Sequence, residues 1–268
     1  MKARQLLSKL PPHLRRDGEL ILAHLLGRRV SSLPLLESDL SPETVRRFQE
    51  LMDRRIGGVP TAYLLGEWDF YGRTFRVREG VLIPRPETEL LVEKILSLIP
   101  DEGVWGFEIG CGSGCISITL LREKENLRMT AGDLNPSAVS LTLENARLHG
   151  VAERIEVFAG DMFEPVAGRK FSFVVSNPPY VPAHLWGKLP REVRREGHLS
   201  VIGGEKGYEF YERFCAEVRD YLLPGGFVAL EIGHDQGKVV RDLLVSAGFE
   251  VMIYKDYAGQ DRIALGWS

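Results

Sequence analysis

The chain has 268 residues, which is long for one compact unit and suits a small domain joined to a larger one. Its hydrophobic content of 44% and charged content of 26% are ordinary values for a soluble protein with a substantial core. No uninterrupted apolar stretch is long enough to span a bilayer, which argues against a membrane protein. The formal net charge of −3 argues against a protein that grips nucleic acid through its phosphates.

Cysteine usage and the start of the chain indicate a reducing compartment. The 3 cysteines are an odd number, which argues against a disulfide framework. The spacing of Cys111 and Cys115 lacks a second ligand pair for zinc, so we expect no metal. Residues 1–4 lead into an amphipathic segment rather than a signal peptide. We expect a cytoplasmic protein, and we expect it to be a monomer.

The first part of the chain is predicted to be helical. Ser41 offers an N-cap and Pro42 suits the first helical position. Apolar residues then recur at helical spacing as far as Ile56, and two glycines follow. Residues 19–26 show a similar spacing and predict a preceding helix.

Basic residues are concentrated in this helical part. Residues 1–56 hold 11 Lys and Arg against 7 Asp and Glu, a balance of +4 that leaves −7 for the rest of the chain. We expect residues 1–62 to form a helical domain that docks the substrate. Solvated helix faces remain an alternative explanation for the basic side chains.

Residues 63–82 are expected to form a β-hairpin linker, because side chains alternate in character over 68–70 and 75–77 on either side of a turn. A proline-stiffened loop, 82–89, follows and begins a helix that is expected to reach Ile99.

Strand and helix patterns alternate in the remainder, residues 83–268. This alternation predicts an α/β fold with a mostly parallel sheet, doubly wound by helices and with an antiparallel edge at the C-terminus. Ligands of such sheets bind beyond the carboxyl ends of the strands. Residues 181–207 are the one long irregular stretch and are expected to form a lid. The expected strands are 104–109, 128–132, 154–158, 171–176, 226–232, 250–254 and 262–265, and the expected helices are 114–123, 136–149, 208–222 and 235–247.

A glycine loop joins the first strand of this region to its helix. Gly110, Gly112 and Gly114 stand at alternate positions, with Cys111 and Ser113 between them. Glycine lets the backbone turn sharply and approach a ligand without a Cβ in the way. Alternating glycines also occur where a strand and a helix pack tightly, so the loop by itself is weak evidence. It lacks the further glycine of a dinucleotide site and the lysine of a phosphate-binding loop.

Two residues close the following strands. Asp133 lies about 20 residues beyond the glycine loop, where an acidic side chain can accept both ribose hydroxyl groups. Met162 follows the third strand and could cover a purine face. The alternatives are that Asp133 caps the helix beginning at Asn135 and that Met162 belongs to the core. A ribose-binding acid without a phosphate anchor favours a nucleoside cofactor, and S-adenosylmethionine fits best.

Asn177-Pro178-Pro179-Tyr180 follows directly after the buried strand 171–176. The two prolines lack an N–H and have fixed φ angles, so this turn is rigid and cannot pair in a sheet. Such a turn suits a planar substrate group that carries an NH₂, because acceptors bind its N–H bonds while the aromatic ring stacks on its plane. A polar turn that only closes a strand is the alternative.

With these motifs in place, the sequence resembles the release factor glutamine methyltransferases over nearly its whole length. The resemblance rests on Leu82-Ile-Pro-Arg-Pro-Glu-Thr-Glu89, Glu108-Ile-Gly-Cys-Gly-Ser-Gly114 and Ser176-Asn-Pro-Pro-Tyr-Val-Pro182. It implies a class I methyltransferase domain with a seven-stranded sheet, a helical N-terminal domain and a hairpin linker. It also implies that S-adenosylmethionine donates a methyl group to the glutamine of the Gly-Gly-Gln motif in peptide chain release factors, leaving S-adenosylhomocysteine.

The resemblance assigns roles by position. Asn177, Pro178 and Tyr180 would be catalytic, and the substrate glutamine would be held by these three and Pro179. The Asn177 oxygen and the Pro178 carbonyl would accept the amide N–H bonds, Tyr180 would pack on the amide, and no strong base would be needed. The cofactor would be contacted by Gly110, Cys111, Gly112, Ser113, Gly114, Asp133, Met162 and Asn177.

Other interpretations remain open at this stage. The Asn-Pro-Pro-Tyr motif also occurs in enzymes that methylate amino groups of adenine or guanine in nucleic acid, and a sister family methylates glutamine in a ribosomal protein. A cofactor-binding adaptor without activity is a third possibility. Residues 84–88 are expected to line the mouth of the pocket, with Thr88 as a helix cap the alternative. Around His198 the sequence departs from the family, and this histidine has no identifiable partner.

Overall fold

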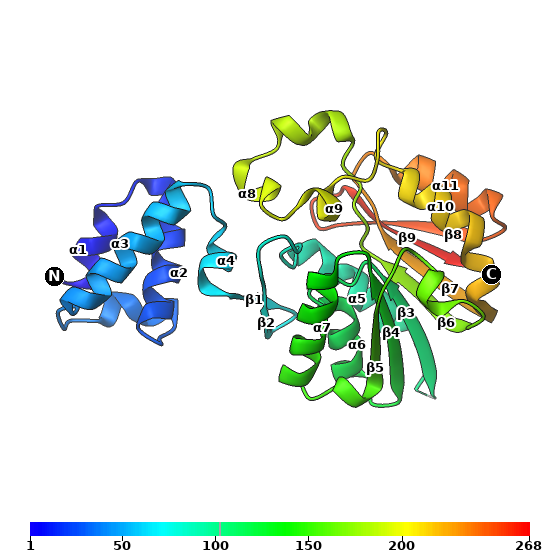
Figure 1. Ribbon diagram of the computed structural model, residues 1–268, viewed down its shortest axis with the longest axis horizontal. Coiled ribbons are helices and arrows are strands. Elements are labelled where there is room, and N and C mark those ends of the chain that lie inside the picture. Colours follow the sequence, from blue (N-terminus) through cyan, green and yellow to red (C-terminus); the bar gives the residue numbers. More distant parts are fainter. Residues whose placement is uncertain (102) are drawn as a thin grey trace. The chain divides into compact units, whose positions relative to one another are not determined.

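The computed structural model describes residues 1–101 and 103–268, and these divide into two compact units. The N-terminal unit comprises Met1–Glu67 together with Pro190–Arg195. The sheet unit comprises Trp68–Leu189 and Glu196–Ser268 (Figure 1). The segment 190–195 therefore packs with residues that lie more than a hundred positions earlier in the sequence.

The N-terminal unit is helical, as predicted. The start of its longest helix at Ser41 is confirmed: the Ser41 hydroxyl accepts a hydrogen bond from the Thr44 N–H at 3.0 Å, and Pro42 occupies the first helical position. Phe48 and Met52 from this helix pack with Ile21 in one buried cluster. The helices are α1 (Ala3–Ser8), α2 (Arg15–Leu25), α3 (Pro42–Ile56), α4 (Thr61–Leu65) and α8 (Arg191–Arg194), with 3₁₀ turns at Pro12–Leu14 and Val30–Leu35.

An ion pair joins α8 to this unit. The Arg55 guanidinium donates to Glu192 at 2.8 Å and to Asp17 at 3.0 Å. Gly58, which has a φ angle of 90°, lies against the side chain of Arg191, and a Cβ at this position would come within 3.0 Å of it. These contacts explain why a segment inserted between two parts of the sheet unit belongs to the N-terminal unit.

The predicted hairpin is present as β1 (Glu67–Phe70) and β2 (Arg73–Arg76). Phe70 and Phe75 are fully buried and join the hydrophobic cluster that includes Leu91 of the following helix. The hairpin is thereby fixed to the sheet unit through its aromatic side chains.

Within the described residues, the sheet unit is built on seven strands in the order β5-β4-β3-β6-β7-β9-β8. The first five strands in this order pair in parallel with one another. Strand β9 pairs antiparallel with both of its neighbours, β7 and β8. The predicted α/β fold, with a mostly parallel seven-stranded sheet and an antiparallel C-terminal edge, is confirmed. The strands are β3 (Val104–Ile109), β4 (Leu127–Asp133), β5 (Ile155–Ala159), β6 (Phe171–Ser176), β7 (Leu222–Glu231), β8 (Glu250–Lys255) and β9 (Asp261–Trp267).

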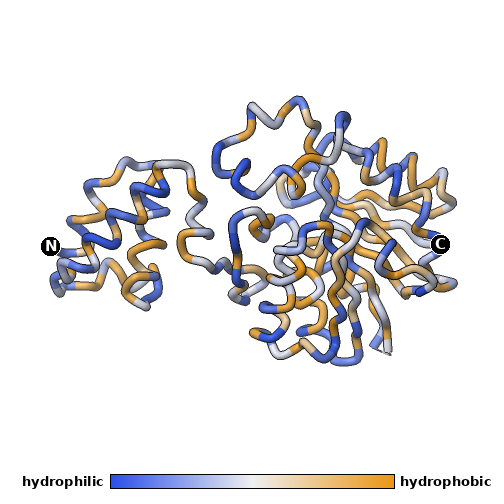
Figure 2. The backbone as a smooth tube through the Cα atoms, in the orientation of Figure 1, coloured by the Kyte–Doolittle hydropathy of each residue, from blue (hydrophilic) through white to orange (hydrophobic). Residues whose placement is uncertain are grey.

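Helices cover both faces of the sheet (Figure 1). One group of helices packs on one face of the sheet and a second group packs on the other. Phe173 and Val175 of β6 lie in a buried cluster with residues of the first group, whereas Val174, which is between them in sequence, lies in a cluster with residues of the second group. Hydrophobic residues therefore run continuously along the central strands (Figure 2), as is typical of parallel strands that are buried on both faces. The first group is α5 (Pro86–Leu98), α6 (Cys115–Glu123) and α7 (Pro136–Leu148), and the second is α10 (Glu209–Glu217) and α11 (Gly237–Ser246).

Several boundaries differ from the prediction; the helix expected at 208–222, for example, ends at Glu217. Strand β7 begins at Leu222 rather than at 226. Leu222 pairs with Phe171 and Phe227 pairs with Phe173, so residues 223–226 form a bulge within the strand and do not precede it. The stretch 181–207 is not wholly irregular, since it contains 3₁₀ turns at Ala183–Lys188 and short helices at Arg191–Arg194 and His198–Val201.

Glycine is required at the centre of the sheet. A Cβ at Gly106 of β3 would lie 2.2 Å from the ring of Phe173 and 2.7 Å from the Met129 sulfur, which buried neighbours cannot accommodate. Gly106→Ala should therefore destabilise the protein by roughly 1–3 kcal/mol in urea unfolding. Gly132→Ala on neighbouring β4 is the matched control, because its Cβ would lie 3.6 Å from Phe107, an ordinary contact. Equal midpoints for the two variants would contradict this account of the packing.

Candidate active site

A cavity of about 310 Å³ lies at the carboxyl edge of the parallel strands. Ile109, the last residue of β3, is paired with Gly132 on one side and with Ser176 on the other, so these strands end at the same level. The chain leaves β3 toward β4 and β5 but later returns to β6 on the opposite side. The cavity thus lies at the point where the strand order reverses, which is the usual ligand site of such sheets.

The glycine loop forms one wall of the cavity. Gly110, Cys111, Gly112 and Ser113 line it, with φ angles of 74° at Gly110 and 56° at Gly112. A Cβ at Gly110 would meet nothing within 4 Å, so a ligand can approach this backbone closely. Gly114 lies outside the lining: its missing Cβ leaves room for Ile118 and Thr142. The structure therefore separates four loop residues at the cavity from one that serves packing.

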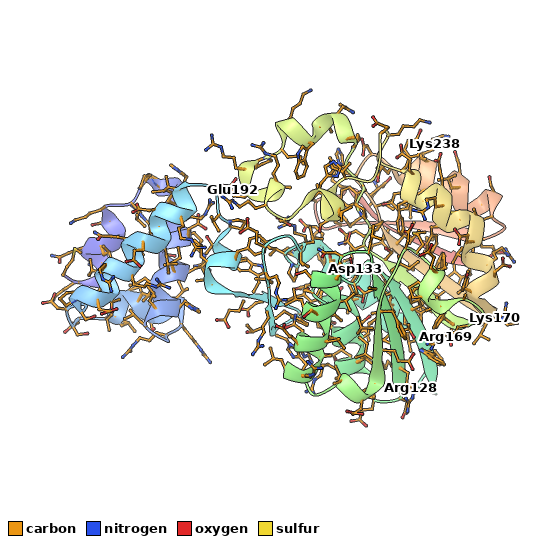
Figure 3. All side chains as sticks on the ribbon, viewed as in Figure 1. Arg128, Asp133, Arg169, Lys170, Glu192 and Lys238 are labelled. Carbon is orange, nitrogen blue, oxygen red and sulfur yellow. The ribbon has the colours of Figure 1, made fainter. Side chains whose placement is uncertain are left out.

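Asp133 lies where β4 ends (Figure 3) and also lines the cavity. Its carboxylate accepts hydrogen bonds from the N–H groups of Gly112 at 2.9 Å and Asn135 at 2.8 Å. Burial raises the pKa of this carboxyl, opposed by the two backbone hydrogen bonds. The alternative that Asp133 caps the next helix is wrong, because Asn135 is the N-cap and its side chain accepts from the Ser137 N–H.

Apolar side chains provide a further part of the lining. Met162 lies in the cavity wall with a φ angle of 51°, a strained value for a residue of this type that is found more often at functional sites than elsewhere. It is also 7% exposed and packs in the core, so the two interpretations of Met162 are compatible. Leu134 and Leu199 line the cavity while 56% and 60% exposed. Neither leucine was predicted to be a site residue, since no local pattern in the sequence marks them.

The Asn177 turn forms another part of the wall, since Asn177 and Pro179 line the cavity. Pro178 is buried and Tyr180 is half-buried, and both lie outside the described lining. The Tyr180 carbonyl accepts a hydrogen bond from the Gln236 amide at 3.0 Å. The turn is thus held by Gln236, the N-cap residue of α11, and it lines the same cavity as the glycine loop.

Part of the 181–207 stretch covers the same cavity. The Val181 N–H donates to the Val201 carbonyl and the Gly203 N–H donates to the Val181 carbonyl, each at 3.0 Å. Leu199, Ser200, Ile202 and Gly203 line the cavity. These backbone bonds fix residues 201–203 directly to the end of the Asn177 turn.

Glu196 ties this stretch to the proline-stiffened loop. Its carboxylate, only 2% exposed, accepts from the Arg85 guanidinium at 2.6 Å and 2.7 Å and from the Ile83 N–H at 3.3 Å. Burial raises the pKa of Glu196, and the charge of Arg85 opposes this rise. His198, for which the sequence suggested no partner, contacts the ring of Trp186 edge-on at 5.0 Å.

Residues 84–88 were predicted to lie at the pocket mouth, and Pro84, Arg85 and Thr88 line the cavity. The alternative that Thr88 caps a helix is wrong, because the N-cap of α5 is Arg85 and makes no capping bond through its side chain. The Thr88 hydroxyl instead contacts Asn177 and Glu231, each from a different strand end.

Two buried carboxyl groups lie at strand ends beside the cavity. Glu108 lines it and accepts hydrogen bonds from the N–H and the hydroxyl group of Ser117, and burial raises its pKa to about 8. Glu231 closes β7, and burial raises its pKa to about 7. Glu231 was not predicted to be a site residue, although it ends a central strand as Asp133 does, and this position was the signal that marked Asp133.

Among residues 1–101 and 103–268, no group of His, Cys, Asp and Glu side chains is arranged to hold a metal ion. No helix within these ranges is long and apolar enough to cross a membrane.

Comparison with known proteins agrees with this fold. A crystal structure of a methyltransferase from Pyrococcus furiosus superimposes with a TM-score of 0.56 at 19% identity, covering 83% of this chain and 96% of that chain. A ribosomal protein L11 methylase from Lactobacillus delbrueckii subsp. bulgaricus gives 0.53 at 18% identity, covering 72% and 84%. A family model described as the methyltransferase small domain matches residues 86–186. The seven-stranded sheet with its cavity at the reversal of strand order is that of a class I methyltransferase.

The family follows from closer relatives. The release factor glutamine methyltransferase of Aquifex aeolicus is 53% identical, covering 100% of this chain and 97% of that protein. The proteins of the same name from Moorella thermoacetica and Escherichia coli are 39% and 34% identical, each covering 94% of this chain and 91% of the relative. A model described as the PrmC N-terminal domain matches residues 1–66. The chain belongs to the release factor glutamine methyltransferase family.

The buried Glu108 should make stability depend on pH. Its pKa of about 8 in the folded protein exceeds the ordinary value of 4.5, so the folded state retains a proton that the unfolded chain releases. The resulting stabilisation is complete below pH 4.5 and is lost by about 1.4 kcal/mol per pH unit as the pH rises toward 8. Glu108→Gln keeps an acceptor for Ser117 and removes this titration.

Urea unfolding across this pH range would measure the effect. We expect Glu108→Gln to gain stability relative to the parent protein as the pH rises. Both proteins should share a further dependence of the free energy of unfolding on pH, which comes from other groups such as Glu231. A difference that stays constant with pH would show that Glu108 is ionised throughout.

Proposed function

We propose that this protein transfers a methyl group from S-adenosylmethionine to the side-chain amide nitrogen, N5, of the glutamine in the Gly-Gly-Gln motif of peptide chain release factors. The observation that carries the proposal is that Asn177 and Pro179 line the same cavity as the glycine loop. Relatives that bear the name of this activity match the chain over its full length, which supports the choice of glutamine as acceptor.

The cavity fits S-adenosylmethionine in shape and chemistry. The open space above Gly110 admits a ligand close to the backbone, and Asp133 offers carboxylate oxygens for ribose hydroxyl groups. Leu134 and Met162 offer apolar surface for a purine. When bound, this cofactor supplies a sulfonium methyl group that is open to displacement. Gly110, Cys111, Gly112, Ser113, Asp133, Met162 and Asn177 would hold it, and Gly114 would support the loop from behind.

The Asn177 turn would hold the glutamine. An amide nitrogen is a weak nucleophile because its lone pair is delocalised, so positioning and fixed dipoles are the main catalytic contributions available. The Asn177 oxygen and the Pro178 carbonyl accept the two N–H bonds of the glutamine and stabilise positive charge as it develops on the nitrogen. Tyr180 packs on the amide and keeps water out. The methylated nitrogen loses its extra proton readily, so no side chain has to act as a strong base.

The N-terminal unit would dock the release factor. We assign docking to residues 1–62, the linker to 63–82 and methyl transfer to 83–268. The excess of basic over acidic residues in 1–56 supports an acidic partner surface. The protein would act in the cytoplasm as a monomer, without binding nucleic acid directly and without a metal.

Incubation with a purified release factor and labelled S-adenosylmethionine tests the proposal. We expect one methyl group on the glutamine of the Gly-Gly-Gln motif, located by mass spectrometry, and no label on DNA, RNA or ribosomal protein. A release factor whose glutamine is replaced should remain unlabelled. Labelled nucleic acid or a labelled ribosomal glutamine would instead favour one of the two alternative functions.

Two substitutions separate the roles of the cavity walls. Asn177→Ala should lower turnover by roughly 10²–10³ because a fixed dipole is lost, while cofactor affinity stays within a few-fold. Asp133→Ala should weaken cofactor binding in calorimetry. Asn126→Ala, an exposed asparagine at the start of β4, is the control and should change neither quantity. Near-normal turnover in Asn177→Ala would refute the assigned role of this residue.

A further inference from the structure

A chain of hydrogen bonds runs behind the Asn177 side chain. The Asn177 amide nitrogen, Nδ2, donates to the Thr88 hydroxyl at 3.0 Å, and the Thr88 hydroxyl donates to Glu231 Oε2 at 2.7 Å. Thr88 and Glu231 are each only 2% exposed. The three residues come from the end of β6, the first turn of α5 and the end of β7, so the fold brings them together from distant parts of the sequence.

The chain of bonds has a direction. An ionised carboxylate can only accept, so the single hydroxyl proton of Thr88 points to Glu231. The Thr88 oxygen is then left as an acceptor, and only the NH₂ end of the Asn177 amide can satisfy it. The Oδ1 end of Asn177 is thereby the end that can accept a hydrogen bond from a ligand in the cavity.

We propose that Thr88 and Glu231 are positioning residues that orient the Asn177 amide, so that its oxygen rather than its NH₂ group faces the substrate amide. The inference rests on the proposed function, in which the Asn177 oxygen accepts a glutamine N–H. Without this fixed direction the amide can rotate by half a turn and present two donors, which cannot bind an N–H group. The oxygen and the NH₂ group of the Asn177 amide have nearly the same shape, and the bond to Thr88 decides which of them faces the substrate.

Protonation of Glu231 reverses the chain. A neutral carboxyl group can donate to Thr88, the Thr88 hydroxyl can then donate to Asn177 Oδ1, and the NH₂ end turns toward the cavity. Burial raises the pKa of Glu231 to about 7; Arg262 and Arg85 oppose this rise, and Glu87 reinforces it. The titratable and charged groups that face Glu231 within the described residues are Arg262 on β9, Arg85 and Glu87 at the start of α5, Tyr180 after β6, Tyr211 on α10 and Cys115 on α6.

The inference predicts the kinetics of Thr88→Val, which keeps the shape and removes the hydroxyl group. We expect its turnover on a release factor to fall roughly 10- to 100-fold, since an essential dipole is loosened rather than deleted, with little change in cofactor affinity. Thr88→Ser restores the hydroxyl group and should restore most of the activity. Thr119→Val is the matched control, because Thr119 is a fully buried threonine whose hydroxyl has no hydrogen-bond partner in the described structure. It should remain as active as the parent protein.

A pH profile separates positioning from mere structural support. Turnover of the parent protein should fall as the pH drops below about 7, because Glu231 becomes protonated and the chain of bonds reverses. Glu231→Gln has no such titration, so this decline on the acid side should disappear, although the variant is slower. Any pH dependence of turnover that comes from Glu108, whose pKa is about 8, should remain in Glu231→Gln. An unchanged decline near pH 7 in this variant would overturn the role of Glu231.

A readout without substrate tests the orientation of the Asn177 amide separately from the proposed function. The Asn177 side-chain NH₂ signal can be identified in a ¹⁵N–¹H spectrum as the one that is lost in Asn177→Ala. We expect its protons to exchange slowly with water in the parent protein and in Thr88→Ser, and faster in Thr88→Val. Unchanged exchange in Thr88→Val would overturn the inference whatever the substrate is.

The two failures are therefore distinguishable. If the parent protein methylates the glutamine but Thr88→Val is equally fast with the same pH profile, the inference is wrong and the proposed function stands. If the parent protein transfers no methyl group to glutamine, yet the Asn177 amide loses protection in Thr88→Val, the proposed function is wrong and the orientation of the amide stands. Thermal unfolding confirms that each variant is folded before these comparisons.

Discussion

The site depends on one constraint, the in-register pairing of β3 with β4 on one side and β6 on the other. Ile109 lies level with both Gly132 and Ser176, so the residues that follow each strand emerge at the same edge. The glycine loop, Asp133 and the Asn177 turn are far apart in sequence, and each is an ordinary turn when considered alone. A shift of one residue in either pairing would move one of them out of line with the others and turn every side chain of that strand to the opposite face of the sheet.

Desolvated acids recur along this edge. Glu108, Asp133 and Glu231 each end or nearly end a strand, and burial raises the pKa of all three. Glu108 and Glu231 each accept a hydrogen bond from a hydroxyl group on a helix, Ser117 and Thr88 respectively, and Asp133 accepts from two backbone N–H groups. Glu231, when ionised, directs the bonds of its neighbour, because a carboxylate can only accept and Thr88 must therefore donate. The cavity wall is therefore ordered electrostatically before any ligand enters.

The sequence predicted the parts of the molecule that local patterns specify. The parallel strands are continuous apolar runs, and a turn with two prolines cannot continue a strand, so β6 and the Asn177 turn were located correctly. The bulge in β7 was missed because Pro-Gly-Gly is typical of a turn, and only pairing with Phe171 and Phe173 keeps it in the sheet. The contact of Thr88 with Glu231 was missed because 143 positions separate them, a distance that no periodicity bridges.

The assignment of residues 190–195 to the N-terminal unit has a consequence for how the chain is connected. The backbone passes between the two units three times, before residue 68, after residue 189 and after residue 195. A fragment that begins at residue 68 would retain Glu192 and Arg191 but lose the residues on which they pack, Arg55 and Gly58. Residue 195, where the backbone returns to the sheet unit, is only four positions before Leu199, which lines the cavity. Truncation at the linker thus removes an anchor as well as a domain.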